Sequence, residues 1–159
     1  MPEVIRIGMA EFKVSKAPGK ISTLGLGSCI GFCAYDYIQK IGGMVHIMLP
    51  NSSLAVEASN PAKFADTGIP FLLKEMVLIG AAENALEFKI VGGAEMFVNG
   101  HEEHLGVGER NILAVEETCQ KLNIRISAKS VGGHAGKSIT LDLDTGALEI
   151  KTMNETFIL

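Results

Sequence analysis

Three residues in the first third of the chain have the side chains that a cysteine hydrolase needs. Cys29 follows a run of small residues, His46 lies in the next apolar run, and Thr23 precedes both. An imidazole beside a thiol favours the reactive thiolate and later returns the proton to the leaving group. A hydroxyl on the other imidazole nitrogen can fix the tautomer, as the third group of a catalytic triad does. The small residues Gly27 and Ser28 leave room for a substrate and let backbone N–H groups face a developing oxyanion.

The two apolar runs that carry Cys29 and His46 are predicted to form a β-hairpin. A loop centred on Tyr37 and Ile38 pairs residues whose numbers sum to 75. Cys29 then lies directly opposite His46, with Cβ atoms about 5 Å apart on one face. A register shift of two leaves the pair as diagonal neighbours on that face, whereas a shift of one places them on opposite faces.

Other interpretations of these residues stay open at this point. A cysteine or a histidine in an apolar strand is more often a packed core residue than a catalytic one. Cys33 shares the predicted face of the nucleophile but lies nearer the turn, and Cys119 falls on the apolar stripe of a helix. A tetrahedral zinc site would need a fourth ligand. His101 and His104 could contribute, but their surroundings are typical of a solvated loop, so we expect neither a metal nor another cofactor.

Mostly strands are expected to position these residues. Apolar and β-branched runs predict strands at 4–7, 21–26, 30–35, 41–49, 88–91, 124–131, 139–143 and 148–151. Asp144-Thr145-Gly146 between the last two is typical of a hairpin turn, so part of the sheet is antiparallel.

Two helices interrupt these strands. Asn60-Pro61 begins the first, which runs towards Gly80 with a kink or break near residue 69 caused by Gly68 and Pro70. The second spans 109–122 and ends at Asn123. The fold class is therefore α/β, a single-domain layered sandwich over residues 1–159 with a mixed or antiparallel sheet and two main helices.

The bulk composition excludes several classes of protein. The chain has 159 residues, 47% hydrophobic and 20% charged, which fits one globular domain. A net charge of −4 without a cluster of Lys and Arg argues against a nucleic-acid partner. No apolar run approaches the roughly 18 residues of a membrane span, and the N-terminus does not resemble a signal peptide. We therefore expect a cytoplasmic protein without membrane insertion, and three cysteines without a disulfide framework agree with this.

Several motifs together resemble one known family, the CheD chemoreceptor glutamine deamidases. A Gly-x-Gly-Ser-Cys motif alone would be weak, but the matching stretches cover nearly the whole chain in order. They are Thr23-Leu24-Gly25-Leu26-Gly27-Ser28-Cys29, His46-Ile47-Met48-Leu49-Pro50, Lys63-Phe64-Ala65-Asp66, Gly92-Gly93-Ala94-Glu95-Met96-Phe97, Gly106-Val107-Gly108-Glu109-Arg110-Asn111 and Val131-Gly132-Gly133-His134-Ala135-Gly136.

The resemblance implies an enzyme that converts receptor glutamines to glutamates through a thioester and releases ammonia. By position, Cys29 is the nucleophile, His46 the base and Thr23 the third member. The resemblance also implies a fold similar to that of the cytotoxic necrotizing factor toxins, and two partners, chemotaxis receptors and a CheC-type phosphatase. Lys137 stands where the family usually has arginine, and lysine lacks the bidentate fork of that side chain.

Two functions from other classes compete with this one. The first is a non-catalytic binding module that regulates a CheC-type phosphatase. The second is a cysteine amidohydrolase or protease that acts on a different amide. Rapid alkylation of Cys29 would argue against the first, and ammonia release without chain cleavage would exclude a protease.

Overall fold

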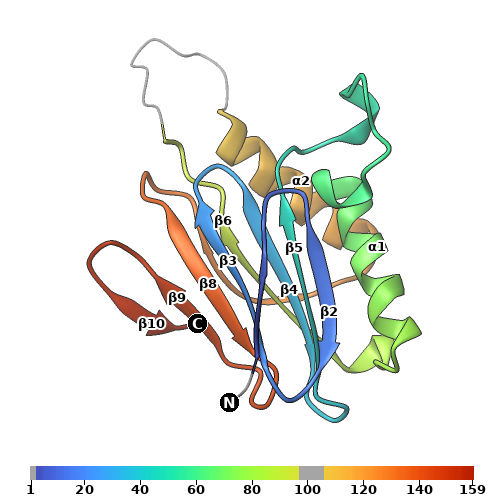
Figure 1. Cartoon of the computed structure of the whole chain (residues 1–159). Coiled ribbons are helices and arrows are strands. Elements are labelled where there is room, and N and C mark those ends of the chain that lie inside the picture. The colour runs from blue at the N-terminus through green and yellow to red at the C-terminus, as the bar shows by residue number, and fades with distance from the viewer. Residues whose placement is uncertain (1–2, 97–105) are drawn as a thin grey trace.

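The computed structural model describes residues 3–96 and 106–159, which form two five-stranded β-sheets and two α-helices (Figure 1). The first sheet has the order β1-β3-β8-β9-β10 and the second the order β2-β5-β4-β6-β7. The pairs β1–β3 and β6–β7 are parallel and the other neighbours are antiparallel, so both sheets are mixed. The strands are β1 Val4–Ile7, β2 Phe12–Lys16, β3 Lys20–Leu26, β4 Ile30–Asp36, β5 Ile41–Ile47, β6 Leu86–Gly92, β7 Ile126–Val131, β8 Lys137–Asp142, β9 Leu148–Lys151 and β10 Thr156–Ile158.

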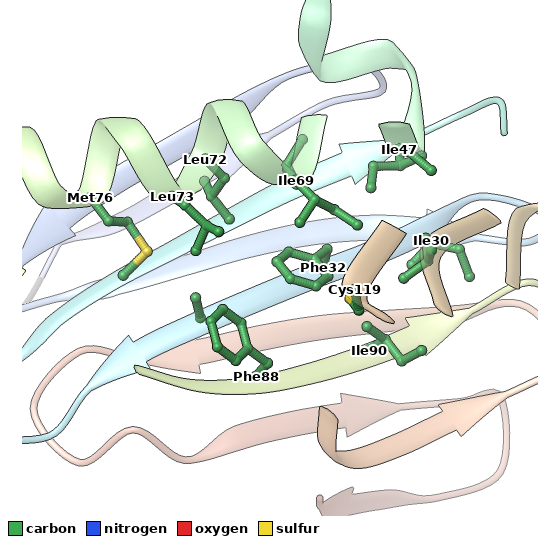
Figure 2. Close-up of a cluster of buried hydrophobic side chains, with 14 of the residues drawn as sticks. Ile30, Phe32, Ile47, Ile69, Leu72, Leu73, Met76, Phe88, Ile90 and Cys119 are labelled. Carbon is green, nitrogen blue, oxygen red and sulfur yellow. The ribbon is translucent and has the colours of Figure 1, made fainter. Parts of the chain in front are cut away.

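The second sheet is covered on both faces. The helices α1 (Ala65–Leu78) and α2 (Val107–Lys121) lie on one side of it, and the first sheet faces the other side (Figure 1). Every residue of β4 and β5 is buried, as expected for strands between two layers. Ile30 and Phe32 pack towards the helices in the cluster of Figure 2, whereas Cys33 packs between the sheets.

The α/β class and the two helices are confirmed, with differences in detail. Asn60 caps a 3₁₀ turn, Pro61–Lys63, by accepting a hydrogen bond from Ala62 N–H at 3.1 Å, and α1 begins after it. The predicted break near residue 69 is wrong, because α1 is continuous through Pro70. Burial of Leu72 and Met76 against the sheet offsets the roughly 3 kcal/mol that an interior proline costs.

Two strands, β2 and β10, were not predicted, and the strands form two stacked sheets where one was expected. The expected likeness to the cytotoxic necrotizing factor toxins stays a prediction. Among the described residues, no helix is long and apolar enough to cross a membrane.

The predicted register of the β4–β5 hairpin is wrong by two residues. Gly31 pairs with His46, so paired residues sum to 77. The loop is centred one position later because Asp36 Oδ1 accepts hydrogen bonds from Ile38 and Gln39 N–H at 2.9 and 3.0 Å. These bonds form an Asx-type turn that closes with Lys40 at φ 53°. A shift of two preserves the face. Cys29 lies just before β4 and packs against the cluster between the sheets, the side on which His46 meets Thr23.

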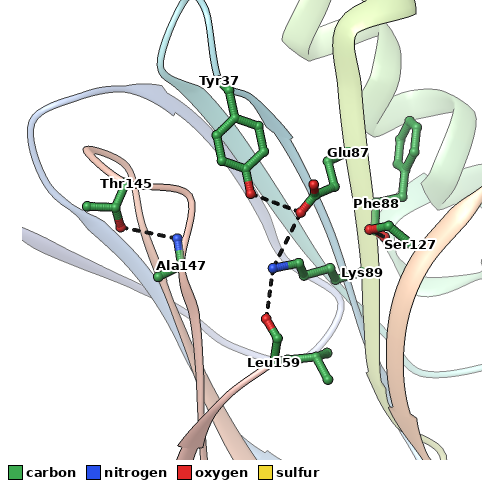
Figure 3. A network of polar contacts seen from close by, with 8 residues as sticks. All are labelled: Tyr37, Glu87, Phe88, Lys89, Ser127, Thr145, Ala147 and Leu159. Atoms are coloured by element: carbon green, nitrogen blue, oxygen red, sulfur yellow. Dashed lines mark hydrogen bonds and ion pairs between the residues drawn. The ribbon is translucent and has the colours of Figure 1, made fainter.

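The hairpin end of the sandwich holds a polar network in which each charged or hydroxyl group finds a partner (Figure 3). Tyr37 donates a hydrogen bond to Glu87 at 2.9 Å, and Lys89 Nζ reaches Glu87 at 3.4 Å and the Leu159 carbonyl at 2.9 Å. The buried carboxylate of Asp36 also accepts from Ala82 N–H. Desolvation alone would raise the pKa of Asp36, but its three backbone hydrogen bonds outweigh that effect and lower the pKa.

Candidate active site

The side chains of Thr23 and His46 meet between the two sheets. Thr23 Oγ1 lies 2.7 Å from His46 Nδ1 and donates its hydrogen to the Ile7 carbonyl at 2.9 Å. A hydroxyl has one hydrogen, so Oγ1 must accept the bond from Nδ1–H. The neutral imidazole therefore carries its free lone pair on Nε2. That atom is buried without a hydrogen-bond partner among the described residues.

The backbone of His46 is held from the edge of the second sheet. Its N–H donates to the Glu11 carbonyl at 3.0 Å, and its carbonyl accepts from Ala10 N–H at 2.9 Å. Together with the Thr23 contact from the first sheet, these bonds fix the imidazole from two layers. The side chain is only 1% exposed.

The loop that carries Cys29 is held by three successive carbonyl groups. The carbonyl of Gly27 accepts from Ala94 N–H at 2.8 Å, and that of Cys29 accepts from Gly93 N–H at 2.9 Å. The carbonyl of Ser28 accepts from the side-chain amide of Asn111 at 2.8 Å. In a trans peptide the N–H points opposite to the carbonyl, so the N–H groups of Ser28 and Cys29 point away from these anchors.

A glycine permits the close approach between this loop and β6. Gly92 has φ 114°, and a Cβ atom there would collide with the carbonyl oxygen of Cys29. Such a backbone conformation is easy only for glycine. The Gly92-Gly93 pair thus lets the end of β6 lie directly against the loop that carries Cys29.

Burial disfavours charge on both groups of the candidate pair. It raises the pKa of Cys29 and lowers the pKa of His46. The expected thiolate is therefore disfavoured at rest, and the pair is neutral near pH 7. Cys29 is half-buried, whereas Cys33 and Cys119 are buried and burial raises the pKa of each to about 12. Only Cys29 of the three thiols can be reached from solvent.

Comparison of the sequence with known proteins places this chain in a family. Residues 48–152 match the family model described as CheD, chemotactic sensory transduction. The chain belongs to the CheD family. A protein of Syntrophomonas wolfei named "Probable chemoreceptor glutamine deamidase CheD" is 47% identical over 154 residues, 96% of each chain. A protein of the same name from Pyrococcus horikoshii is 42% identical over 151 residues, 95% of this chain and 93% of its own.

The CheD resemblance deduced from the motifs is confirmed by these matches. The matched segment of the family model begins at Met48, after Thr23, Cys29 and His46. The match to the family model therefore does not depend on those three residues, and their roles stay a prediction. The relatives cover the N-terminal third as well.

Several residues considered for other roles do not join this candidate site. Cys119 lies in the core between α2 and the second sheet. His101, His104 and Phe97 lie outside the described residues. Within residues 3–96 and 106–159, no group of three or more His, Cys, Asp or Glu side chains could hold a metal ion.

One residue of the site was not identified from the sequence. Asn111 belongs to a motif shared with the CheD family, but nothing in the sequence assigned it a role. It contacts Ser28, 83 positions earlier in the chain. No local pattern signals a contact across such a distance.

Proposed function

We propose that this chain is a cysteine hydrolase that deamidates glutamine side chains of chemoreceptors. Cys29 is the nucleophile, His46 the general base and Thr23 the group that orients the imidazole. The observation that carries the proposal is the hydrogen-bond chain from the Ile7 carbonyl through Thr23 to Nδ1. It leaves the basic lone pair on Nε2, between the sheets, where Cys29 also packs. Relatives named chemoreceptor glutamine deamidases supply the substrate class.

The first half of the reaction forms a thioester. His46 Nε2 takes the thiol proton as the sulfur of Cys29 attacks the carboxamide carbon of the substrate. Because burial favours the neutral pair, this proton moves during the attack and not before it. The carbonyl electrons move to oxygen, which accepts hydrogen bonds from backbone N–H groups. The C–N bond then breaks as the imidazolium protonates the leaving nitrogen, and ammonia departs.

Ser28 and Cys29 supply the oxyanion donors in this proposal. Their N–H groups point away from the side on which Gly93, Ala94 and Asn111 hold the loop. The N–H of Gly27, the other expected donor, already donates to the Gly25 carbonyl at 3.0 Å and is not used.

The second half releases the product. His46 takes a proton from water as the water oxygen attacks the thioester carbon. The C–S bond breaks, the proton returns to the sulfur of Cys29, and the side chain leaves as glutamic acid, which ionises in water. The imidazole begins and ends neutral, so no cofactor enters the balance.

A receptor signalling domain provides the test. It is incubated with the wild-type protein or with a Cys29→Ala variant, and both ammonia and intact mass are measured. The proposal expects ammonia and a mass gain of roughly 1 Da per converted glutamine, from wild type alone, since the variant lacks the nucleophile. A cleaved chain without ammonia would indicate a protease, and equal activity of the variant would exclude Cys29.

We further propose that a CheC-type phosphatase binds near the same mouth. The half-exposed apolar side chain of Met96 lies against Gly27, and Leu24, three residues before Gly27 in the chain, is also half-exposed. An apolar mouth predicts competition with the receptor and weak salt dependence. Titrating the phosphatase into the deamidation assay at two salt concentrations should raise the apparent KM at both. A purely non-competitive effect would contradict a shared mouth.

A further inference from the structure

A single buried amide group joins the two chain segments that carry the nucleophile and the base. Asn111 on α2 is fully buried. Its Nδ2 donates to the Ser28 carbonyl at 2.8 Å and to the Met48 carbonyl at 3.0 Å. Ser28 directly precedes the nucleophile, and Met48 follows the base by two residues.

The orientation of this amide is fixed by its partners. A carbonyl can only accept, so the group between Ser28 and Met48 must be the NH₂ and not the oxygen. The oxygen Oδ1 is consequently buried, and it has no hydrogen-bond partner among the described residues. An unpartnered buried acceptor costs free energy. One turn further along α2, the equally buried position 115 is occupied by a valine, which has an apolar side chain and packs in the hydrophobic core. Packing alone therefore does not explain an asparagine at position 111.

The place where Asn111 contacts the two chain segments explains the asparagine better. The β4–β5 ladder ends at the pair Ile30–Ile47. Beyond that pair the two chains have no ladder bond to set their separation, yet Cys29 lies beyond it. The NH₂ of Asn111 supplies the missing tie, because it holds both chains just past the last ladder pair.

The helix that carries Asn111 is itself well anchored. The carboxylate of Glu95 accepts from Glu109 N–H at 2.8 Å at the N-terminal turn of α2. Ile112 packs closely over Gly93, and Val115 and Cys119 bury their side chains on the second sheet. A rigid helix makes Asn111 a fixed reference for both chains.

We propose that Asn111 is a positioning residue that sets the spacing between Cys29 and His46 and aims the Cys29 N–H at the oxyanion. The inference rests on the proposed function of those two residues. The bond to the Ser28 carbonyl fixes the plane of the Ser28–Cys29 peptide, and thereby the direction of the Cys29 N–H. The bond to the Met48 carbonyl holds the His46 segment at the matching distance.

Three variants separate this role from packing. Asn111→Asp keeps the shape but replaces the donor with an acceptor, Asn111→Ala removes the group, and Val115→Ala deletes apolar volume one turn away. For each folded variant, kcat and KM of deamidation are measured, together with the rate at which iodoacetamide alkylates Cys29. Peptide mapping distinguishes Cys29 from the two buried thiols. The alkylation assay needs no receptor, so a failure of the deamidase proposal in wild type is seen separately.

Both Asn111 variants should lose at least about tenfold in kcat with KM nearly unchanged, because small displacements of reacting groups have effects of this size. Alkylation of Cys29 should slow in parallel. Val115→Ala should lose thermal stability but keep kcat and the alkylation rate within about twofold of wild type. Asn111 variants with wild-type kcat and alkylation rate would overturn the inference. An equal kinetic loss in Val115→Ala would overturn it as well.

Discussion

Polar side chains gather at both ends of the second sheet, but their hydrogen bonding differs. At the hairpin end, the Asp36 carboxylate accepts three backbone N–H bonds, and Tyr37, Glu87 and Lys89 satisfy one another (Figure 3). At the other end, two buried polar atoms have no partner among the described residues. They are His46 Nε2 and Asn111 Oδ1.

The difference separates stability from chemistry. A buried group with all its partners rigidifies the fold and has no free lone pair for a substrate. A buried acceptor without a partner costs stability. The hairpin end thus contributes stability, whereas the proposed roles of His46 and Asn111 account for unpartnered groups at the other end.

The largest expected effect is at the nucleophile. Cys29→Ala should lower kcat by at least about a thousandfold and leave the thermal unfolding midpoint nearly unchanged, because the sulfur is half-buried and is the nucleophile of the proposed mechanism. Ammonia release and calorimetry on the same sample measure both. Cys33→Ala is the matched control, since Cys33 packs between the sheets four residues later. It should lose stability but keep most activity. Residual activity above a tenth in Cys29→Ala would remove Cys29 from the mechanism.

Removal of the proposed base, His46, should lower kcat more than removal of its proposed orienting group, Thr23. His46→Ala should lower kcat by about a hundredfold to ten-thousandfold, the usual contribution of a general acid–base. Thr23→Val keeps the shape and loses one hydrogen bond to an imidazole that becomes charged, so about tenfold to hundredfold is expected. Steady-state kinetics on both variants give the ratio. A larger loss in Thr23→Val than in His46→Ala would reverse the assigned roles.

The hairpin end should respond in stability alone. Asp36→Ala leaves three N–H groups without their acceptor, so unfolding should become easier by about 3 kcal/mol. Urea titration measures this, and kcat per folded molecule should stay at the wild-type value. A loss of kcat at full folding would show that the two ends are coupled.

The contribution of Asp36 to stability should also depend on pH. The folded pKa of Asp36 is lowered, so its contribution to stability is present above the ordinary value of 3.8 and is lost as pH falls below it. Wild type should therefore lose stability below pH 3.8 more steeply than Asp36→Ala does.

The smallest expected effect is a shift of the acid limb of the kcat/KM profile to lower pH. His46 must be neutral to accept the thiol proton, and burial lowers its pKa from the ordinary 6.5. The acid limb of the kcat/KM profile should therefore lie below pH 6.5, with the pair still active at that pH. A rate that already falls as pH drops from 8 towards 7 would indicate an imidazole whose pKa is not lowered.

The sequence predicted that the strands around Cys29 and His46 pair and which side chains share a face, but not the exact register of the hairpin. The apolar runs around Cys29 and His46 specify two paired strands, and period-two alternation fixes which side chains share a face. The register depends on which residue starts the turn, and that was decided by the side chain of Asp36 bonding to Ile38 and Gln39. The local sequence contained this signal, but turn propensity alone placed the loop one residue too early.

Other features had no local signal at all. The second sheet layer depends on whether β3 pairs with β5 or with β8, and strand patterns do not specify partners. The tautomer of His46 depends on the carbonyl of Ile7, a backbone atom that carries no sequence information. The contact of Asn111 with Ser28 likewise arises only when α2 is packed on the sheet.

The strand order of the first sheet makes the site a late product of synthesis. β3, which carries Thr23, lies between β1 and β8. It therefore finds its second neighbour only after the strand that begins at residue 137 has been made. The Cys29 loop likewise waits for its anchors Gly93, Ala94 and Asn111. Contacts this far apart in the chain form slowly. An unfinished chain on the ribosome therefore carries the thiol of Cys29 without these supports until β8 has been made.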